Sequence, residues 1–269
     1  MKRTLGTAFK YLFLIVAAGL SVFPLYWMAV SATNTSQAVL SGSLIPGGSL
    51  AANYRTLLAG QDVWNAMKNS FINAFLQTFL ALFICSLAGY GFEIYHDRGK
   101  DRVMSILLLA MMVPVAATMI PLFRMFSRMG LLNTYTAFIL PAVSTPFLIM
   151  MFRQNARSFP HDIIEAARID GVSEVGIFFK MFIPTMKSTY AAAMTITFMN
   201  AWNSYLWPKV ILQSKESTTM PMLIANLIAG YVTDYGSLML AVLLCTLPTI
   251  VIFFALQRFF TEGIAGSVK

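Results

Sequence analysis

Apolar runs alternate with short polar connections along the 269-residue chain. Six runs have about the 20 residues that an α-helix needs to cross a bilayer. A hydrophobic content of 58% and a charged content of 11% are far from the usual soluble mixture. We therefore predict an all-α integral membrane protein, embedded in lipid as a single transmembrane domain over residues 1–269. The predicted spans cover about residues 11–32, 70–92, 103–123, 134–152, 188–208 and 236–257.

Prolines interrupt two of these spans. Pro114 and Pro121 lie in the third span, and Pro141 and Pro146 lie in the fourth. A proline inside a helix leaves a carbonyl without its usual partner, and neighbouring helices or water must satisfy that carbonyl. We therefore expect both spans to be bent.

A charged segment, PHDIIEAARIDGVSEVGIFFKMFIP, separates the fourth and fifth spans. Pro160 fits the first position of a helix, and Gly171 can adopt the left-handed conformation that ends one. Ser173 is a plausible cap for a second helix, which should stop or kink at Pro184. The pattern predicts two short helices that meet at a glycine, and we name this stretch the 160–184 segment.

Small side chains surrounded by charges form the first half of this segment. Ala166, Ala167 and Gly171 would let a partner's surface approach closely, and Glu165 and Asp170 would lie around them. This arrangement favours docking on another protein. An amphipathic helix in the lipid headgroups is the alternative, since the segment also offers an apolar face: Ile164, Val172, Val175, Phe178, Phe179 and Phe182.

The residues Glu165, Ala166, Ala167 and Gly171, followed by an apolar stretch that ends at Pro184, resemble the EAA motif of ABC importer permeases. Conservative apolar exchanges separate the end of this stretch from the usual motif, with Met181 in place of Ile and Ile183 in place of Leu. Together with the six apolar spans and the sequence NAWNSYLWP in the fifth, the chain is similar to the carbohydrate-uptake branch, and specifically to the second permease of maltose-type transporters. The likeness covers nearly the whole chain.

This resemblance implies a type I permease fold in the bacterial inner membrane, with a cytoplasmic coupling helix between spans four and five. It also implies four partners: a second homologous permease, an ATPase homodimer, an extracytoplasmic solute-binding protein and a sugar substrate. The ATPase-coupling residues would be Glu165, Ala166, Ala167, Asp170 and Gly171. Two alternatives are an importer of another small polar solute and a stand-alone carrier. The carrier is disfavoured because ionisable residues are nearly absent from the middle of the spans.

The basic residues predict the orientation. With both termini in the cytoplasm, 13 of the 19 Lys and Arg residues lie on the cytoplasmic side, as the positive-inside rule requires. This places the 160–184 segment in the cytoplasm without use of the resemblance. The 13 residues are Lys2, Arg3, Lys10, Arg98, Lys100, Arg102, Arg153, Arg157, Arg168, Lys180, Lys187, Arg258 and Lys269.

Motifs for catalysis or cofactor binding are absent from the sequence. It has no phosphate-binding G-x-x-x-x-G-K-[ST] loop, no H-E-x-x-H zinc motif and no G-x-S-x-G nucleophile turn. Cys85 and Cys245 are far apart, and His96 and His161 have no second ligand at metal-binding spacing. We expect no enzyme activity, no metal and no cofactor. The net charge of +8 follows from the cytoplasmic loops, so nucleic acid is not expected as a partner.

Amides at helical spacing mark candidate residues for a translocation pathway. Asn73 and Gln77 follow Asn69 at intervals of four in the second span, and they could face a hydroxylated substrate or hold helices together. In the fifth span, Asn200 and Asn203 lie near aromatic residues that suit sugar rings, although an aromatic belt at the membrane interface would look similar. We name Asn73, Gln77, Asn200, Asn203 and Tyr205 as candidate pathway residues.

The segment from Lys209 to Tyr235 is long for a connection, and it has a polar tip, KESTTMP. In maltose-type permeases the corresponding outer loop enters the binding protein. The resemblance therefore makes Ser217, Thr218 and Thr219 candidates for this contact. An ordinary solvated loop is the alternative.

Overall fold

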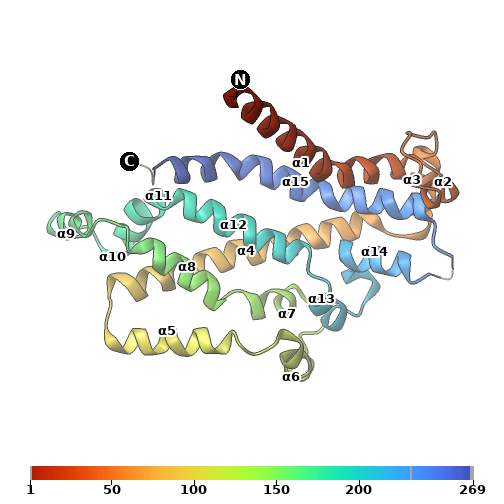
Figure 1. Ribbon diagram of the computed structural model, residues 1–269. Coiled ribbons are helices and arrows are strands. Elements are labelled where there is room, and N and C mark those ends of the chain that lie inside the picture. Colours follow the sequence, from red (N-terminus) through yellow and green to blue (C-terminus); the bar gives the residue numbers. More distant parts are fainter. Residues whose placement is uncertain (1, 231, 267–269) are drawn as a thin grey trace. The chain divides into compact units, whose positions relative to one another are not determined.

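The computed structural model describes residues 2–230 and 232–266 (Figure 1). The regular elements of this part of the chain are all helices, without a strand, so the all-α prediction is confirmed. Tyr231 and Lys269, which belong to the predicted outer segment and the cytoplasmic basic set, lie outside the described residues. The α-helices are α1 (Lys2–Ala32), α2 (Ser36–Leu40), α3 (Leu50–Gly60), α4 (Val63–Ile94), α5 (Arg98–Ala110), α6 (Val115–Arg128), α7 (Tyr135–Ile139), α8 (Pro146–Ala156), α9 (His161–Ile169), α10 (Glu174–Ile177), α11 (Ile183–Thr185), α12 (Lys187–Trp202), α13 (Leu206–Ile211), α14 (Met220–Ile228) and α15 (Tyr235–Gly266). Short 3₁₀ helices are η1 (Leu140–Ala142) and η3 (Lys215–Ser217), and η2 (Phe178–Phe182) is π-helical.

The chain divides into two compact units. The first unit comprises Met1–Trp64 and Leu223–Pro248, and the second comprises Asn65–Met222 and Thr249–Lys269. In the first unit, the buried Asn53 side chain donates to the carbonyls of Ala32 and Asn34 at 2.9 Å each. Asp234 accepts hydrogen bonds from the hydroxyls of Ser36 and Ser237. The connection after α1 is thereby joined to the start of α15.

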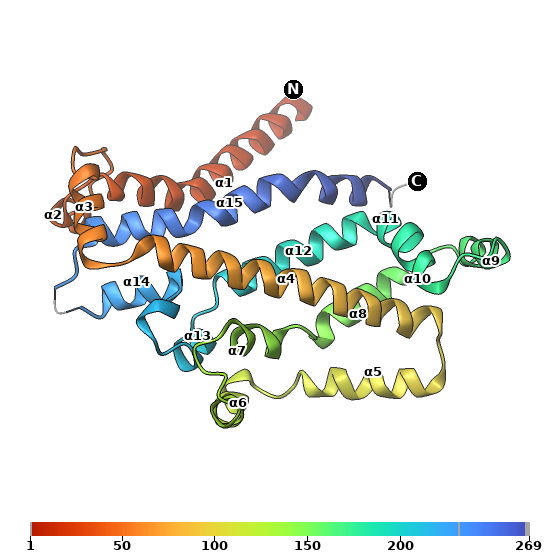
Figure 2. The ribbon, with the colours of Figure 1, turned by 180° about the vertical axis from the view of Figure 1, so that it is seen from behind.

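In the second unit, α8 and α12 lie beside α4 (Figures 1 and 2). Their shared core contains small residues as well as large ones, which lets the helices approach closely. A Cβ atom added at Gly89 would lie 2.6 Å from Phe152 Cβ and 2.8 Å from the backbone nitrogen of Arg153. Only glycine therefore fits where α4 crosses α8. The buried members of this core are Ala81, Leu82, Cys85, Met104, Leu148, Ile149, Phe152 and Ala193.

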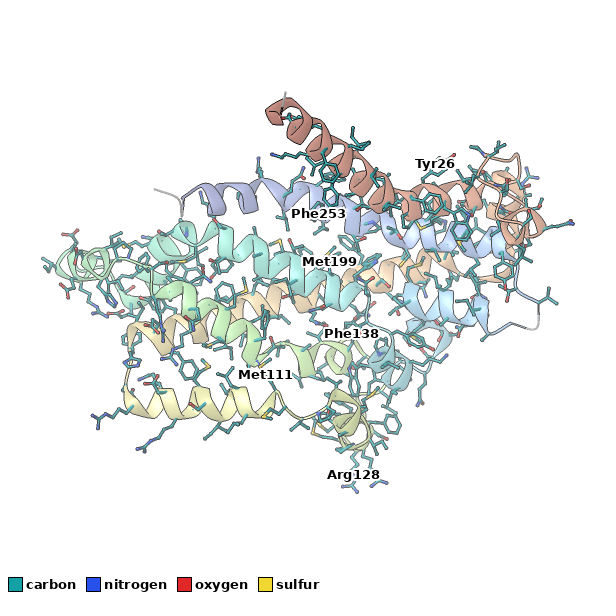
Figure 3. All side chains as sticks on the ribbon, in the orientation of Figure 1. Tyr26, Met111, Arg128, Phe138, Met199 and Phe253 are labelled. Carbon is teal, nitrogen blue, oxygen red and sulfur yellow. The ribbon has the colours of Figure 1, made fainter. Side chains whose placement is uncertain are left out.

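Both proline-containing spans are bent, as predicted. The axes of α5 and α6 differ by 98°, and Pro114 is the residue directly before α6. Figure 3 labels Met111 at this break. The helix axis changes direction here by much more than a slight kink. The axis from Tyr135 to Ala142 makes 49° with α8, which begins at Pro146.

Three described helices are long and apolar enough to cross a membrane by length and composition: Phe9–Ala32, Val63–Ile94 and Tyr235–Phe259. The two bent pairs raise this to five if each pair forms one span. The helix predicted over residues 188–208 ends earlier, because α12 stops at Trp202 after 16 residues, or about 24 Å. Trp207 therefore belongs to α13, and its indole nitrogen donates to the Ala137 carbonyl at 3.1 Å.

The glycine contact between α4 and α8 yields a first prediction. Gly89→Ala should lower the stability of the purified protein by about 1–3 kcal/mol, because the added methyl group has no room against the α8 backbone. Gly91→Ala is the matched control on the same helix, since nothing lies within 4 Å of its Cβ position. The control should be neutral or stabilising by up to about 1 kcal/mol. Equal thermal unfolding temperatures for the two variants would contradict this account of the helix crossing.

Candidate functional site

The 160–184 segment forms two helical stretches that meet at Gly171, as predicted, but Pro160 lies one position before the first helix and the second continues past Pro184. Pro160 is the residue before α9, and Gly171 has φ +74°, which is the left-handed conformation expected after a helix. The Ser173 hydroxyl accepts a hydrogen bond from the Gly176 backbone N–H at 3.2 Å and so caps α10. Helical structure continues through the π-turn η2 and one further turn that contains Pro184, and it breaks at Met186.

An aromatic cluster packs this segment against the carboxyl-terminal end of α4. The Tyr90 ring lies 4.8 Å from the Phe182 ring and 5.4 Å from the Phe178 ring, measured between centroids. Phe159 packs edge-on against Phe182 at 5.6 Å. The segment is therefore attached to the helical core by large, interlocking side chains. The buried residues of this cluster are Tyr90, Ala156, Phe159, Ile164, Ala167, Ile177, Phe178, Phe182 and Met186.

The structure divides the motif residues between surface and core. Glu165, Ala166, Asp170 and Gly171 are exposed, whereas Ala167 is only 2% exposed and packs in the cluster. A Cβ atom at Gly171 would meet nothing within 4 Å, so this turn presents open surface. Of the five motif residues, only Ala167 is therefore closed to a partner's surface.

The apolar face considered for a lipid-bound helix is largely used inside the protein. Ile164, Phe178 and Phe182 are each at most 1% exposed, while Val175 and Phe179 remain exposed. An interfacial helix binds lipid in proportion to the apolar area that it can offer. Ile163 and Ile169 on α9 are exposed as well. The face named from the sequence is therefore mostly used inside the protein, but other apolar side chains of the segment remain available to lipid.

Glu174 joins the two halves of the segment to the end of α4. Its carboxylate accepts hydrogen bonds from Arg168 Nε at 2.7 Å and from the Tyr95 hydroxyl. The bond from Arg168 lowers the pKa of Glu174 below its ordinary value. The stabilising effect of the pair is thus present above the pKa of the unfolded chain and is lost only as the pH falls through the lowered folded pKa. At neutral pH the contact is fully formed.

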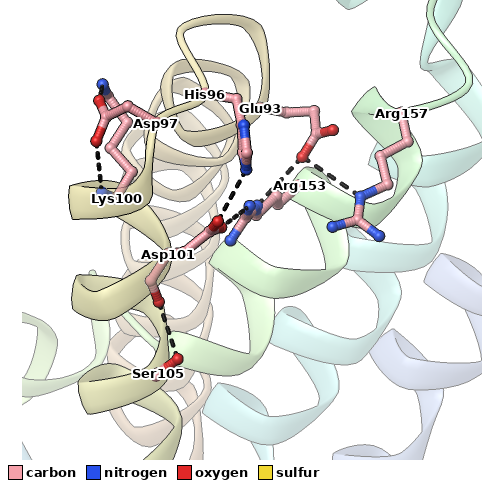
Figure 4. Close-up of polar contacts among 8 residues, drawn as sticks. All are labelled: Glu93, His96, Asp97, Lys100, Asp101, Ser105, Arg153 and Arg157. Atoms are coloured by element: carbon pink, nitrogen blue, oxygen red, sulfur yellow. Dashed lines mark hydrogen bonds and ion pairs between the residues drawn. The ribbon is translucent and has the colours of Figure 1, made fainter.

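A charged network lies where α8 leads into the 160–184 segment (Figure 4). Arg153, 4% exposed, donates to Glu93 at 3.2 Å and to Asp101 at 2.6 Å. His96 contacts Asp101 at 3.0 Å, and Arg157 contacts Glu93 at 3.4 Å. Arg153 therefore links α8 to the end of α4 and the start of α5. Its role could not be read from the sequence, because its two partners lie more than 50 positions away and carry no recognisable motif.

A polar cavity of about 420 Å³ lies near the amino-terminal part of α4. It brings together Asn73 and Ser217, which the sequence placed in two separate candidate sites. The cavity is lined by Asn69, Asn73, Asn133, Thr134, Tyr135, Thr136, Leu212, Ser214, Glu216 and Ser217.

The other candidate pathway residues do not line this cavity. Gln77 is buried one turn further along α4. Asn200 and Asn203 are exposed at the end of α12, and Tyr205 follows in the break before α13. The exposed amides of α12 and the cavity therefore form two separate polar regions.

Residues 213–218 form a turn that asparagine side chains hold in place. Asn133 has φ +62°, and its Oδ1 accepts from the backbone N–H groups of Gln213 at 2.5 Å and Ser214 at 2.7 Å. Asn69 Nδ2 donates to the carbonyls of Glu216 at 2.6 Å and Thr218 at 3.0 Å. Sequence reasoning missed Asn133, although asparagine tolerates the left-handed conformation better than most residues.

Of the predicted tip residues, Ser217 and Thr218 are part of this turn, and Thr219 follows it directly. Ser217 and Thr218 are half-buried, and Thr219 is 2% exposed. The next backbone N–H, that of Met220, donates to the Ser70 hydroxyl at 2.8 Å. An account of this region as an unstructured solvated loop therefore does not apply to the described residues.

Bent apolar helices and a helix–glycine–helix segment on their surface define a membrane-embedded permease. The model of the family described as "Binding-protein-dependent transport system inner membrane component" matches residues 87–266, which is more than half of the chain. The chain belongs to this family. Its members are the permease components of ABC importers, and they are not enzymes.

Curated relatives match along nearly the full length. The lactose transport system permease protein LacG of Rhizobium radiobacter is 43% identical over 273 residues, covering 100% of this chain and 98% of that protein. The arabinooligosaccharides transport system permease protein AraQ of Bacillus subtilis is 33% identical and covers 96% and 94%. The sn-glycerol-3-phosphate transport system permease protein UgpE of Escherichia coli is 30% identical and covers 98% and 97%.

The fold is also similar to a solved structure. A chain from the crystal structure of a bacterial ABC transporter involved in the import of the acidic polysaccharide alginate superposes with a TM-score of 0.81. The match covers 96% of this chain and 97% of that one at 20% sequence identity. This likeness supports the permease fold.

Asn133 yields a second prediction. Asn133→Ala should increase hydrogen exchange and protease cleavage across residues 213–218, because two backbone N–H groups lose their acceptor. Asn133→Gly should loosen the same turn but keep the left-handed backbone, and it should be about 1 kcal/mol more stable than the alanine variant. Unchanged exchange in the glycine variant would show that the side chain does not hold the turn.

Proposed function

We propose that this chain is a permease subunit of an ATP-binding-cassette importer for sugars or oligosaccharides in the bacterial inner membrane. It pairs with a second homologous permease, an ATPase homodimer and an extracytoplasmic solute-binding protein. The observation that carries the proposal is the firmly packed 160–184 segment with Glu165, Ala166, Asp170 and Gly171 on its exposed surface. The names of the lactose and arabinooligosaccharide relatives support the sugar class.

The 160–184 segment is proposed to bind the ATPase. A surface that transmits movement needs a rigid attachment to the helices that move. The aromatic cluster around Tyr90 and the hydrogen bond from the Tyr95 hydroxyl to Glu174 supply such an attachment. Small exposed residues at Ala166 and Gly171 leave room for the partner's side chains.

Six spans with both termini in the cytoplasm are proposed for the membrane topology. Each of the three long helices and the two bent pairs would form one span, and α12, extended by α11, would form the remaining one. The charge distribution supports this orientation through the positive-inside rule. The polar cavity and the 213–218 turn then lie toward the outside, and the 160–184 segment lies toward the cytoplasm.

The substrate pathway is proposed to include Asn73, Gln77, Asn200, Asn203 and Tyr205. Asn200 and Asn203 support this assignment because they expose amides at the end of α12. Ser217, Thr218 and Thr219 are proposed to contact the solute-binding protein through the ordered turn at residues 213–218 and the residue that follows it.

An importer of another small polar solute is the second candidate, and the sn-glycerol-3-phosphate relatives favour it. The complete importer reconstituted in vesicles distinguishes the two. We expect ATP-dependent uptake of a neutral sugar such as lactose and little uptake of glycerol 3-phosphate. The reverse preference would replace the sugar assignment with the second candidate.

Gly171 gives a direct test of ATPase docking. Gly171→Ala and Gly171→Leu both incur the cost of about 1–2 kcal/mol for a left-handed non-glycine residue. Only the leucine side chain also projects well beyond the surface at this turn, where it would clash with a docked partner. The leucine variant should therefore reduce co-purification of the ATPase far more than the alanine variant does. Equal amounts of ATPase with both variants would remove the docking role from this surface.

The proposed topology is tested by cysteine labelling in intact cells. Single cysteines at Gly99 and Gly171 should resist a membrane-impermeant thiol reagent added from outside, because basic residues around both turns favour the cytoplasm. A cysteine at the exposed Gln213 position should be labelled and serves as the control. External labelling of either glycine position would overturn the six-span arrangement.

A further inference from the structure

The polar cavity beside Asn73 has the size of a ligand site. Its volume of about 420 Å³ falls within the roughly 300–1,000 Å³ typical of small-molecule sites. Its walls come from α4, from residues 133–136 at the start of α7 and from residues 212–217. Of its ten lining residues, only Leu212 lacks a polar atom in its side chain.

Most polar groups of the wall are already used to build it. Asn133 Oδ1 accepts from two backbone N–H groups, and Asn69 Nδ2 donates to two carbonyls. The Thr134 hydroxyl donates to the Leu131 carbonyl at 2.6 Å. The wall is therefore held in shape whether or not a ligand is bound.

Asn73 differs from these neighbours. It is 2% exposed, and its Oδ1 has no hydrogen-bond partner among the described residues. A buried acceptor without a donor is unfavourable, and Asn73 is one of the lining residues. A hydroxyl or N–H group of an occupant would therefore be stabilised when the Asn73 side chain turns its Oδ1 toward the cavity. Thr136 and Glu216 are also among the lining residues.

The charge of the lining restricts the chemistry of the occupant. No Lys or Arg is among the lining residues, and Glu216 supplies the one formal charge. A phosphate or a carboxylate would meet a like charge and find no cation to pair with. A neutral, hydroxyl-rich molecule can instead donate to amide and carboxylate oxygens and pack a C–H face against Tyr135.

We propose that this cavity is a subsite for a neutral saccharide, in which a sugar hydroxyl donates to Asn73 Oδ1. The inference rests on the proposed sugar importer and adds two points to it: the subunit itself contacts the sugar, and neutral sugars are preferred over phosphorylated or acidic ones. The subsite shares Ser217 with the turn proposed to contact the binding protein, so a sugar released there would enter the cavity directly.

The test uses the complete importer in vesicles with saturating, sugar-loaded binding protein. Lactose is the neutral probe, and a galacturonate dimer is the acidic probe. Asn73→Leu keeps a similar volume but removes the acceptor, and it should reduce lactose uptake about tenfold. Thr78→Val is the matched control, because Thr78 Oγ1 is also buried and unpartnered on α4 but does not line the cavity. This control should retain uptake within about twofold of the unmodified importer.

Two variants at exposed lining positions keep the proposal testable if Asn73→Leu fails to fold. Thr136→Val should lower lactose uptake, and Glu216→Lys should raise uptake of the acidic probe by supplying the missing cation. A purely structural role for the cavity would leave this selectivity unchanged.

The outcomes separate this inference from the proposed function. If the unmodified importer takes up lactose and the variants at Asn73, Thr136 and Glu216 do so at the same rate, the subsite is wrong and the sugar importer stands. If the unmodified importer takes up the acidic probe in preference to lactose, the proposed preference for neutral sugars is wrong, and the sugar importer itself stands. If no sugar is taken up at all, the proposed function fails, and the subsite fails with it.

Discussion

The packing of Tyr90 against Phe178 and Phe182 decides how the 160–184 segment can move. Protein interiors are close-packed, so α9 and α10 cannot shift past the end of α4 without a discrete repacking of these rings. The Arg168–Glu174 pair and the bond from the Tyr95 hydroxyl add polar contacts at the same place. In the proposed importer, force applied to the exposed motif residues would therefore be passed to α4 and α8 as a displacement of the whole cluster.

Helix α4 links this cluster to the polar cavity. It carries Asn69 and Asn73 in its amino-terminal part and Tyr90 near its carboxyl-terminal end, and its 32 residues span about 48 Å. The close approach at Gly89 and the Arg153 network fix α4 to α8 beside the cluster. A rigid helix that joins two such sites can change the shape of one when the other moves. In this account, ATPase movement and saccharide access to the cavity are coupled through α4.

Local signals in the sequence predicted the segment well and predicted its surroundings less well. Pro160, Gly171 and Ser173 act through backbone rules that depend on neighbouring residues only. Gly171 and Ser173 have their expected roles, and Pro160 lies one position before the helix that it was expected to begin. The burial of Ala167 beside the exposed Ala166 depends on which face of α9 meets Tyr90, and this is a tertiary contact. Asn133 and Arg153 act on partners far away in the chain, so no local pattern marks them. The apolar runs predicted helices, but the early end of α12 follows from the turn that Asn203 to Tyr205 makes toward α13.

The central claim is that one face of the 160–184 segment binds the ATPase while the other face is fixed in the core. Cysteine cross-linking at two adjacent positions tests it most directly, since Ala166 is exposed and Ala167 is 2% exposed. In the assembled importer, a cysteine at position 166 should cross-link to the ATPase subunit, and a cysteine at position 167 should not. Absence of cross-linking at position 166, or equal cross-linking at both positions, would contradict the account.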